Sequence, residues 1–189
     1  MLDLQKETLG DEAYLHICRE AGLISYLIDR LLTLGNIDEA ARETQSIDND
    51  DQFLGLADLF IHHQQDAVAE RLAKARSKEK PVVRVLEWLQ TYYQARENYT
   101  ATLEVTETLF RTQPLLKHYQ RLCDLARQLG CWQTLRPALL AFLVASKTTR
   151  PLIEIALDEG EIDKALLQLK ELAKKDRYGT TYELAKAKL

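Results

Sequence analysis

The stretch Leu-Gly-Asn-Ile-Asp-Glu-Ala at 34–40 has the pattern of one helix ending and another beginning, and four similar stretches follow it. They are His-His-Gln-Gln-Asp-Ala-Val (62–68), Arg-Glu-Asn-Tyr-Thr-Ala-Thr (96–102), Leu-Gly-Cys-Trp-Gln-Thr-Leu (129–135) and Glu-Gly-Glu-Ile-Asp-Lys-Ala (159–165). The second residues, at 35, 63, 97, 130 and 160, are separated by 28, 34, 33 and 30 residues. A period in this range is typical of stacked helical hairpins, each burying its apolar face against its neighbours.

Three kinds of residue mark the same helix boundaries. Glycine tolerates the left-handed conformation that ends many helices, and it is found at Gly22, Gly35, Gly130 and Gly160. Side chains that can accept hydrogen bonds from the first N–H groups of the next helix are Asp38, Asp66, Thr100 and Asp163. Proline is tolerated in a first helical turn, which we expect at Pro81, Pro114 and Pro151.

Apolar residues with helical spacing predict helices nearly throughout the chain from Asp11 onward. We expect them at about 11–21, 23–34, 38–46, 51–63, 66–77, 81–96, 99–112, 114–129, 132–146, 150–159, 162–175 and 180–188. The predicted fold class is all-α, a right-handed α-α superhelix of about five to six hairpins in a single solenoid domain, residues 1–189. Its parts are an irregular leader at 1–10 and hairpins at about 11–34, 38–63, 66–96, 99–129, 132–159 and 162–188.

Composition excludes several classes of protein. Of the 189 residues, 46% are hydrophobic and 29% charged, which is ordinary for a globular chain and unlike a disordered one. The longest apolar run, Ala138 to Ala145, is far shorter than the ~20 residues of a membrane span. Three scattered cysteines at 18, 123 and 131 argue against a disulfide framework, and nothing at the start resembles a secretion signal. We therefore expect a cytoplasmic protein.

Charge is unevenly distributed along the chain. Residues 1–80 carry 9 basic and 16 acidic side chains, a net charge of −7, whereas residues 81–189 carry 16 and 13, a net charge of +3. Such a gradient can orient a charged partner, or it can reflect no more than the composition of solvated helix faces.

The boundary motifs resemble those of tetratricopeptide repeats. Gly-x-Ile-Asp-x-Ala at 35–40 and 160–165, and Glu97-Asn98-Tyr99-Thr100-Ala101, are similar to the entry of that repeat's second helix, and Pro114 falls where the repeat places its terminal proline. The small residue that the repeat places in its first helix is instead Gln90 in one repeat and Cys123 in the next. The resemblance implies stacked hairpins whose first helices line a concave face.

Four short motifs are also similar, in their order, to the helical C-terminal region of bacterial SWIM zinc-finger proteins. They are Arg-Glu-Ala-Gly-Leu (19–23), the stretch at 34–40, Leu-Glu-Trp-Leu (86–89) and Leu-Arg-Pro-Ala-Leu-Leu (135–140), and the likeness spans most of 13–170. The cysteine and histidine signature of the finger itself is absent, so the resemblance implies no zinc binding or nucleic-acid binding by a finger.

No local motif predicts catalysis, a cofactor or a metal. The glycines are scattered, and no Cys-x-x-Cys pair occurs among His16, Cys18, His62, His63, His118, Cys123 and Cys131. Cys123 is predicted to be a small core residue. His62 and His63 are predicted to lie at a helix C-terminus, where a histidine interacts favourably with the helix dipole and the last carbonyls. The run Asp48-Asn49-Asp50-Asp51 is interpreted as a solvated turn with an Asp cap rather than a cation loop.

A partner-binding groove is predicted on the concave face that the tetratricopeptide-like register gives. Its polar residues recur on one ridge of the first helices, at Ser25, Asp29, Arg84, Glu87, Thr91, Gln94, Lys117, Gln120, Asp124 and Arg127. The alternative is that these are the solvent-facing residues that any amphipathic helix carries.

The favoured hypothesis is a non-enzymatic scaffold that binds a protein partner, or an upstream domain of the same polypeptide, through this groove. A nucleic-acid accessory module is the first alternative, supported by the +3 half, by the SWIM likeness and weakly by Lys170, Lys174, Lys175 and Arg177. An all-α enzyme with a site assembled from separate repeats is the second. We expect no membrane partner. The apolar helix at 11–21 predicts a solenoid end covered by residues 1–10, by a neighbouring domain or by a second copy in a homodimer.

Overall fold

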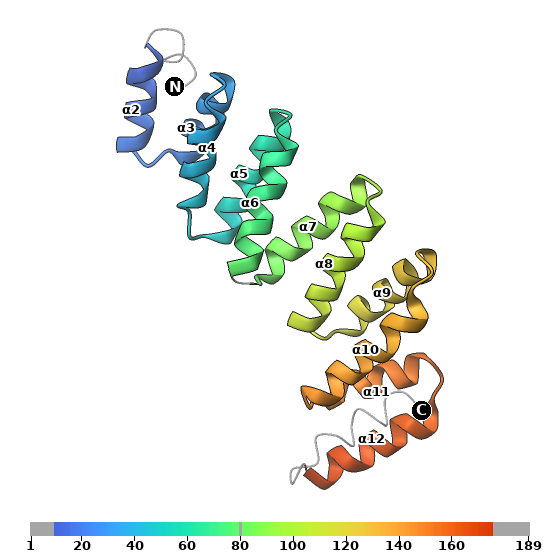
Figure 1. The fold of residues 1–189 in the computed structure, drawn as a ribbon. Coiled ribbons are helices and arrows are strands. Elements are labelled where there is room, and N and C mark those ends of the chain that lie inside the picture. The colour runs from blue at the N-terminus through green and yellow to red at the C-terminus, as the bar shows by residue number, and fades with distance from the viewer. Residues whose placement is uncertain (1–9, 80, 176–189) are drawn as a thin grey trace. The chain divides into compact units, whose positions relative to one another are not determined.

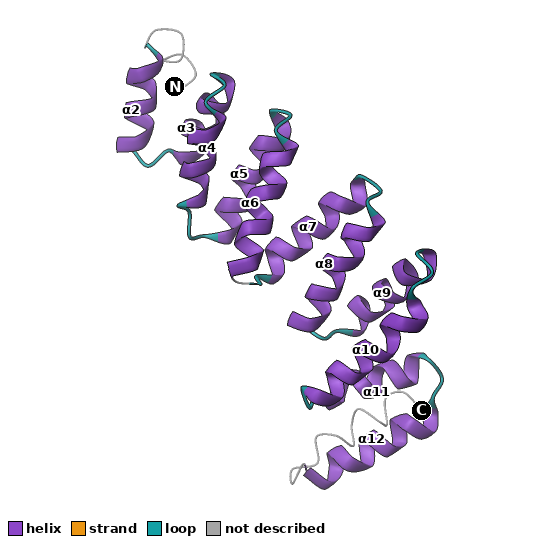
Figure 2. Cartoon of the chain, viewed as in Figure 1, coloured by secondary structure: helices purple, strands orange, loops and turns teal. Residues whose placement is uncertain are grey.

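The computed structural model describes residues 10–79 and 81–175, and these are helical with no β-strand among them (Figure 2). The described helices are α2 (Asp11–Glu20), α3 (Ile24–Thr33), α4 (Ile37–Gln45), α5 (Asp50–His62), α6 (Asp66–Glu79), α7 (Val83–Ala95), α8 (Tyr99–Thr112), α9 (Leu116–Gln128), α10 (Trp132–Ala145), α11 (Thr149–Asp158) and α12 (Ile162–Lys175).

The all-α prediction is confirmed for the described residues, and each predicted helix in them differs from the observed one by two residues or fewer at either end. The helix expected at 180–188 and nearly all of the leader expected at 1–10 lie outside the described residues. None of the described helices has both the length and the hydrophobicity that crossing a membrane requires.

Seven of the helices in the described part of the chain end in the same way, at a residue with positive φ. Four of these residues are the predicted glycines, with φ between 65° and 77°, and three are not glycine: Gln64, Glu97 and Lys147, with φ of 59°, 54° and 56°. In each case the next residue donates its N–H to a carbonyl five residues back, as Asn36 does to Leu31 at 2.8 Å and Gln65 to Phe60 at 2.7 Å. This hydrogen bond closes a helix C-terminus. The second boundary stretch therefore turns at Gln64, one residue later than predicted.

The predicted N-caps are largely wrong. α8 is capped by Asn98, whose side chain accepts a hydrogen bond from the Ala101 N–H at 3.1 Å, while Thr100 lies inside the helix. The cap position of α4 is occupied by Asn36, so Asp38 lies in the first turn. Asp66 and Asp163 likewise lie in the first turns of α6 and α12. Acidic residues remain favourable there because they face the positive end of the helix dipole.

Two further boundary predictions are corrected. The N-cap of α5 is Asn49 and not one of the aspartates in the 48–51 run. The Asn49 side chain accepts a hydrogen bond from the Gln52 N–H at 2.9 Å. Pro151 lies in the first turn of α11, as predicted, whereas Pro81 and Pro114 precede the first residues of α7 and α9.

The chain divides into two compact units, residues 1–89 and 90–189. In the first unit the helices from α2 to α6 pack on one another in sequence order, and α3 also contacts α5 while α4 contacts α6 (Figure 1). The core between them is made of Leu27, Ile28, Leu31, Phe53, Leu56 and Phe60, each at most 1% exposed. At the α2 end, Tyr14, Leu15 and Cys18 are buried and Ile17 is 40% exposed; what covers this end stays a prediction.

The second unit has an aromatic core. Phe110 of α8, Tyr119 of α9 and Trp132 of α10 meet there, with the Tyr119 and Trp132 ring centres 5.4 Å apart in an edge-to-face arrangement. α9 contacts α8, α10 and α11, and α11 also packs on α10 and α12. α9 is therefore the central helix of this unit, and its polar side is placed beside the end of α11.

Candidate partner-binding cleft

A cavity of about 240 Å³ lies beside α9 and the C-terminal end of α11, within the second unit. Its lining residues are Tyr119, Gln120, Cys123, Asp124 and Arg127 from α9, with Asp158 and Glu159 from the end of α11. Three of these seven residues, Gln120, Asp124 and Arg127, belong to the predicted groove. We refer to this cavity as the α9–α11 cleft.

The helical period of α9 explains why these side chains reach the cleft. Tyr119, Leu122 and Ala126 recur every three to four residues and are buried in the core. Gln120, Asp124 and Arg127 recur with the same spacing on the adjoining, exposed side. The Gly160 turn ends α11 and leaves Asp158 and Glu159 at the cleft.

The wall of the cleft is held by hydrogen bonds that converge on Glu159. The Tyr119 hydroxyl donates to Glu159 Oε1 at 2.7 Å, and Arg136 of α10 donates to both carboxylate oxygens, at 3.0 and 2.5 Å. The bond from Arg136 lowers the pKa of Glu159 below its ordinary value and is the largest cause of that shift. Burial first, and then Glu159, raise the pKa of Tyr119. At neutral pH Glu159 is therefore a carboxylate and Tyr119 a protonated donor.

Cys123 is half-buried, lines the cleft and packs against the aromatic core, which only partly matches its prediction as a core residue. Burial raises the pKa of the Cys123 thiol above its ordinary value. The residue is therefore a thiol at neutral pH, not the thiolate that nucleophilic chemistry needs.

The groove residues on α9 differ in their contacts. Gln120 donates from Nε2 to Asp158 Oδ1 at 2.8 Å, which ties α9 to α11. The Arg127 guanidinium lies 6.0 Å from the ring centre of Trp132. The Asp124 side chain forms no hydrogen bond or ion pair within the described part of the chain. Lys117 is exposed on the same helix but does not line the cavity.

The other predicted groove residues are placed differently. Asp29 bonds to His63 Nε2 at 2.9 Å, and Arg84 forms an ion pair with Asp51 at 2.6 Å, so both side chains contact neighbouring helices. Ser25, Thr91 and Gln94 are exposed and Glu87 is half-buried. The prediction that these residues bind a partner stays a prediction.

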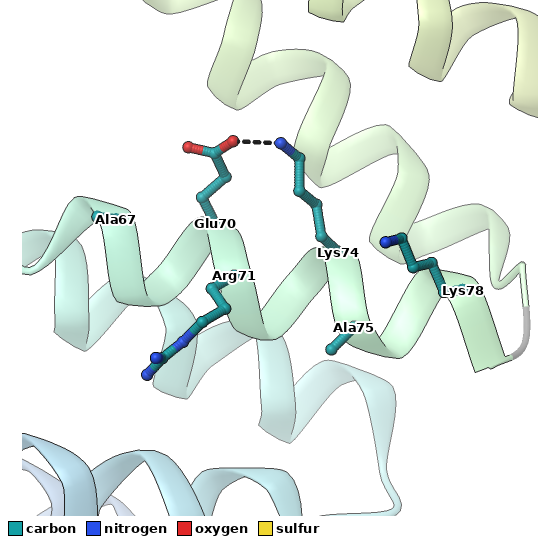
Figure 3. Close-up of a pocket in the computed structure, with 6 residues that line it drawn as sticks. All are labelled: Ala67, Glu70, Arg71, Lys74, Ala75 and Lys78. Atoms are coloured by element: carbon teal, nitrogen blue, oxygen red, sulfur yellow. Dashed lines mark hydrogen bonds and ion pairs between the residues drawn. The ribbon is translucent and has the colours of Figure 1, made fainter.

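Sequence reasoning missed a second cavity, of about 440 Å³, along α6 (Figure 3). The α6 side chains that line it are Ala67, Glu70, Arg71, Lys74, Ala75 and Lys78, of which Lys74 pairs with Glu70 at 2.6 Å. A helical spacing of basic residues was the available signal. No group of three or more His, Cys, Asp and Glu residues that could hold a metal occurs in residues 10–79 and 81–175.

Comparisons with known proteins found no matching protein-family model, no similar curated protein and no similar solved structure.

Replacing Glu159 with glutamine is expected to lower the free energy of unfolding by about 1–2 kcal/mol at pH 7, since the neutral side chain loses the charge-assisted bonds from Arg136. Folding lowers the pKa of Glu159 from 4.5, so the carboxylate stabilises the fold fully above that pH and progressively less as pH falls through the folded-state pKa. Urea unfolding of the wild type and of E159Q between pH 7 and pH 3 measures how the difference in their free energies of unfolding depends on pH.

The matched control for E159Q is Glu104→Gln, an exposed position on α8. We expect it to change the free energy of unfolding by less than about 0.5 kcal/mol. A difference between E159Q and the wild type that is the same at every pH would contradict the assignment of the Arg136 bond as its cause.

Proposed function

We propose that the chain is a non-catalytic helical-repeat module that binds a protein partner, or another domain of its own polypeptide, through the α9–α11 cleft. The observation that carries the proposal is the cleft itself. The cavity lies beside the polar ridge of α9, and its opposite wall is formed by the C-terminal end of α11, two helices further along the chain.

The contacts between alternate helices support a solenoid. α3 contacts α5, α4 contacts α6, and α9 contacts α11, as expected when each hairpin packs on the next. We accordingly propose a right-handed stack of hairpins of the tetratricopeptide-like type. We also propose that this stack is related to the helical C-terminal region of SWIM zinc-finger proteins, which it resembles. Cytoplasmic location belongs to the same proposal.

Solenoids of this kind act by presenting a surface, and the chemistry of the cleft fits that role. Its single thiol is protonated, its tyrosine is engaged by Glu159, and Glu159 is engaged by Arg136. The side chains left to meet a partner are Asp124, Arg127 and the second oxygen of Asp158. These are groups for recognition through hydrogen bonds and charge.

Photo-crosslinking in the cells that make the protein tests the proposal. A benzoylphenylalanine residue replaces Gln120 in the cleft in one variant and Glu104 on the exposed side of α8 in another. We expect a discrete protein adduct from position 120 that is absent from position 104. Equal adducts at both positions, or none at 120, would rule out the cleft as the binding site.

A further inference from the structure

We propose that the α9–α11 cleft receives a positively charged side chain of its partner, an arginine in preference to a lysine, against Asp124 and Asp158. This inference rests on the proposed function and names the chemistry that the cleft recognises.

Alternate helices carry an acidic residue at one equivalent position near their C-terminal ends. α3, α5, α7, α9 and α11 end at the positive-φ residues Gly35, Gln64, Glu97, Gly130 and Gly160. The residues six places before these are Asp29, Asp58, Thr91, Asp124 and Glu154. An acidic side chain therefore recurs at the same place in four of the five helices, so Asp124 can be compared with its counterparts.

In the first unit the corresponding aspartates each bond to a ring nitrogen from the next alternate helix. His63, the C-cap of α5, bonds through Nε2 to Asp29 at 2.9 Å. Trp88 of α7 donates from Nε1 to Asp58 at 2.8 Å. Because a carboxylate only accepts, both ring nitrogens carry the hydrogen. At this position the fold thus pairs a carboxylate with an N–H donor supplied by its neighbour.

At Asp124 the neighbouring helix supplies no such donor. The residue of α11 that corresponds to His63, one place before the positive-φ residue, is Glu159, and the one that corresponds to Trp88, nine places before it, is Pro151. A carboxylate and a proline side chain have no N–H to give at neutral pH. Asp124 instead faces a cavity of about 240 Å³, and its side chain forms no hydrogen bond or ion pair with the described residues.

The charges around this cavity favour a cation at Asp124. Glu159 is neutralised by Arg136, so the remaining charged groups of the lining are Asp124, Asp158 and Arg127, with a net charge of −1. Asp158 has one oxygen occupied by Gln120. The negative end of the α11 dipole lies on the same side. Two carboxylates suit the planar fork of a guanidinium better than a compact ammonium group.

Arg127 also lines the cleft and restricts which partner sequences can bind there. Its guanidinium repels a second cation beside the first, and it can donate to a main-chain carbonyl of the partner. The recognised feature is therefore an isolated basic residue in a peptide, rather than a polybasic tract.

Titration of the ¹⁵N-labelled full chain, followed by the chemical shifts of its amides, tests the inference. The probes are the capped tripeptides acetyl-Gly-Arg-Gly-amide and acetyl-Gly-Glu-Gly-amide, with acetyl-Gly-citrulline-Gly-amide as the matched control. Citrulline keeps the shape of arginine and removes its charge. A single charge-assisted contact gives dissociation constants in the millimolar range, so titration runs to about 10 mM.

We expect the arginine peptide to shift amides of 120–127 and 157–161, with at least about fivefold tighter binding than the citrulline peptide. Asp124→Asn should weaken the arginine peptide by about five- to tenfold, and Asp163→Asn, an exposed control on α12, should not. Preserved shifts elsewhere in the spectrum show that each variant is folded.

Two results would overturn the inference. One is equal shifts with arginine and citrulline peptides, or no shifts in the cleft. The other is cleft shifts from the glutamate peptide that Arg127→Ala removes, which would make the cleft an anion site. In either case the crosslink at position 120 still decides the proposed function separately.

Discussion

Replacing Phe110 with alanine is expected to lower the free energy of unfolding of the second unit by about 3–5 kcal/mol, the usual cost of truncating a buried phenylalanine. Phe110 is 0% exposed and packs between Tyr119 and Phe142, with ring centres 6.1 and 6.4 Å away. Three neighbouring helices contribute these rings, so their backbones cannot easily close the space that is left.

The two tryptophans make this measurement specific. Trp88 lies in the first unit and Trp132 in the second, so urea unfolding followed by fluorescence in a Trp88→Phe background reports the second unit. Val144→Ala on α10, where the side chain is 63% exposed, is the control and should cost less than about 0.5 kcal/mol. A loss below about 1 kcal/mol for Phe110→Ala would show that the aromatic core is not tightly packed.

Replacing Arg76 with alanine is expected to cost the first unit about 2–4 kcal/mol, although arginine substitutions at surfaces are usually mild. Arg76 of α6 binds the Asp50 carboxylate at 2.7 Å and the carbonyls of Ile47 and Asp48 at 2.6 and 2.5 Å. Its guanidinium also stacks 4.5 Å from the centre of the Phe53 ring, and its side chain is only 18% exposed. Alanine removes the donors and the packing together.

Arg71→Ala is the matched control on the same helix, since the Arg71 side chain is exposed and forms no hydrogen bond or ion pair with the described residues. It should cost less than about 0.5 kcal/mol. Arg76→Lys should fall between the two, because an ammonium group cannot reproduce the planar fork. Unfolding followed by Trp88 fluorescence in a Trp132→Phe background measures all three. If Arg76→Ala and Arg71→Ala agree within about 0.5 kcal/mol, Arg76 does not fix the 47–50 segment.

Helix positions were predictable because their causes are local. The φ of a residue such as Gly130 depends on its own side chain, and a helical period is visible within a dozen residues. Caps were predicted less well, because a cap depends on the residue at which the preceding turn finishes. Asn36 and Asn98 directly follow positive-φ residues and so occupy the cap positions, while Asp38 and Thr100 fall inside the helices. The turn at Lys147 has a positive φ without a glycine, so nothing in the sequence indicated it.

The cleft was half predictable for a related reason. Gln120, Asp124 and Arg127 share one ridge of α9, and a ridge follows from helical spacing alone. Asp158 and Glu159 reach them only because α11 packs on α9, about one repeat further along the chain. Arg76 and Arg136 were missed because the groups that a long side chain binds are set by packing between helices, which spacing along one helix does not reveal.

The positive-φ residues Gln64, Glu97 and Gly130 are spaced by 33 residues each, and every one is followed by the same closing hydrogen bond. A duplicated or deleted segment of that length would thus join the remaining chain at a turn with the same positive φ and the same closing hydrogen bond. A single added residue within a helix would rotate all that follows by about 100° and turn its buried side outward. On the proposed solenoid, the chain can therefore change in length by whole modules, whereas a single-residue insertion within a helix disrupts its packing.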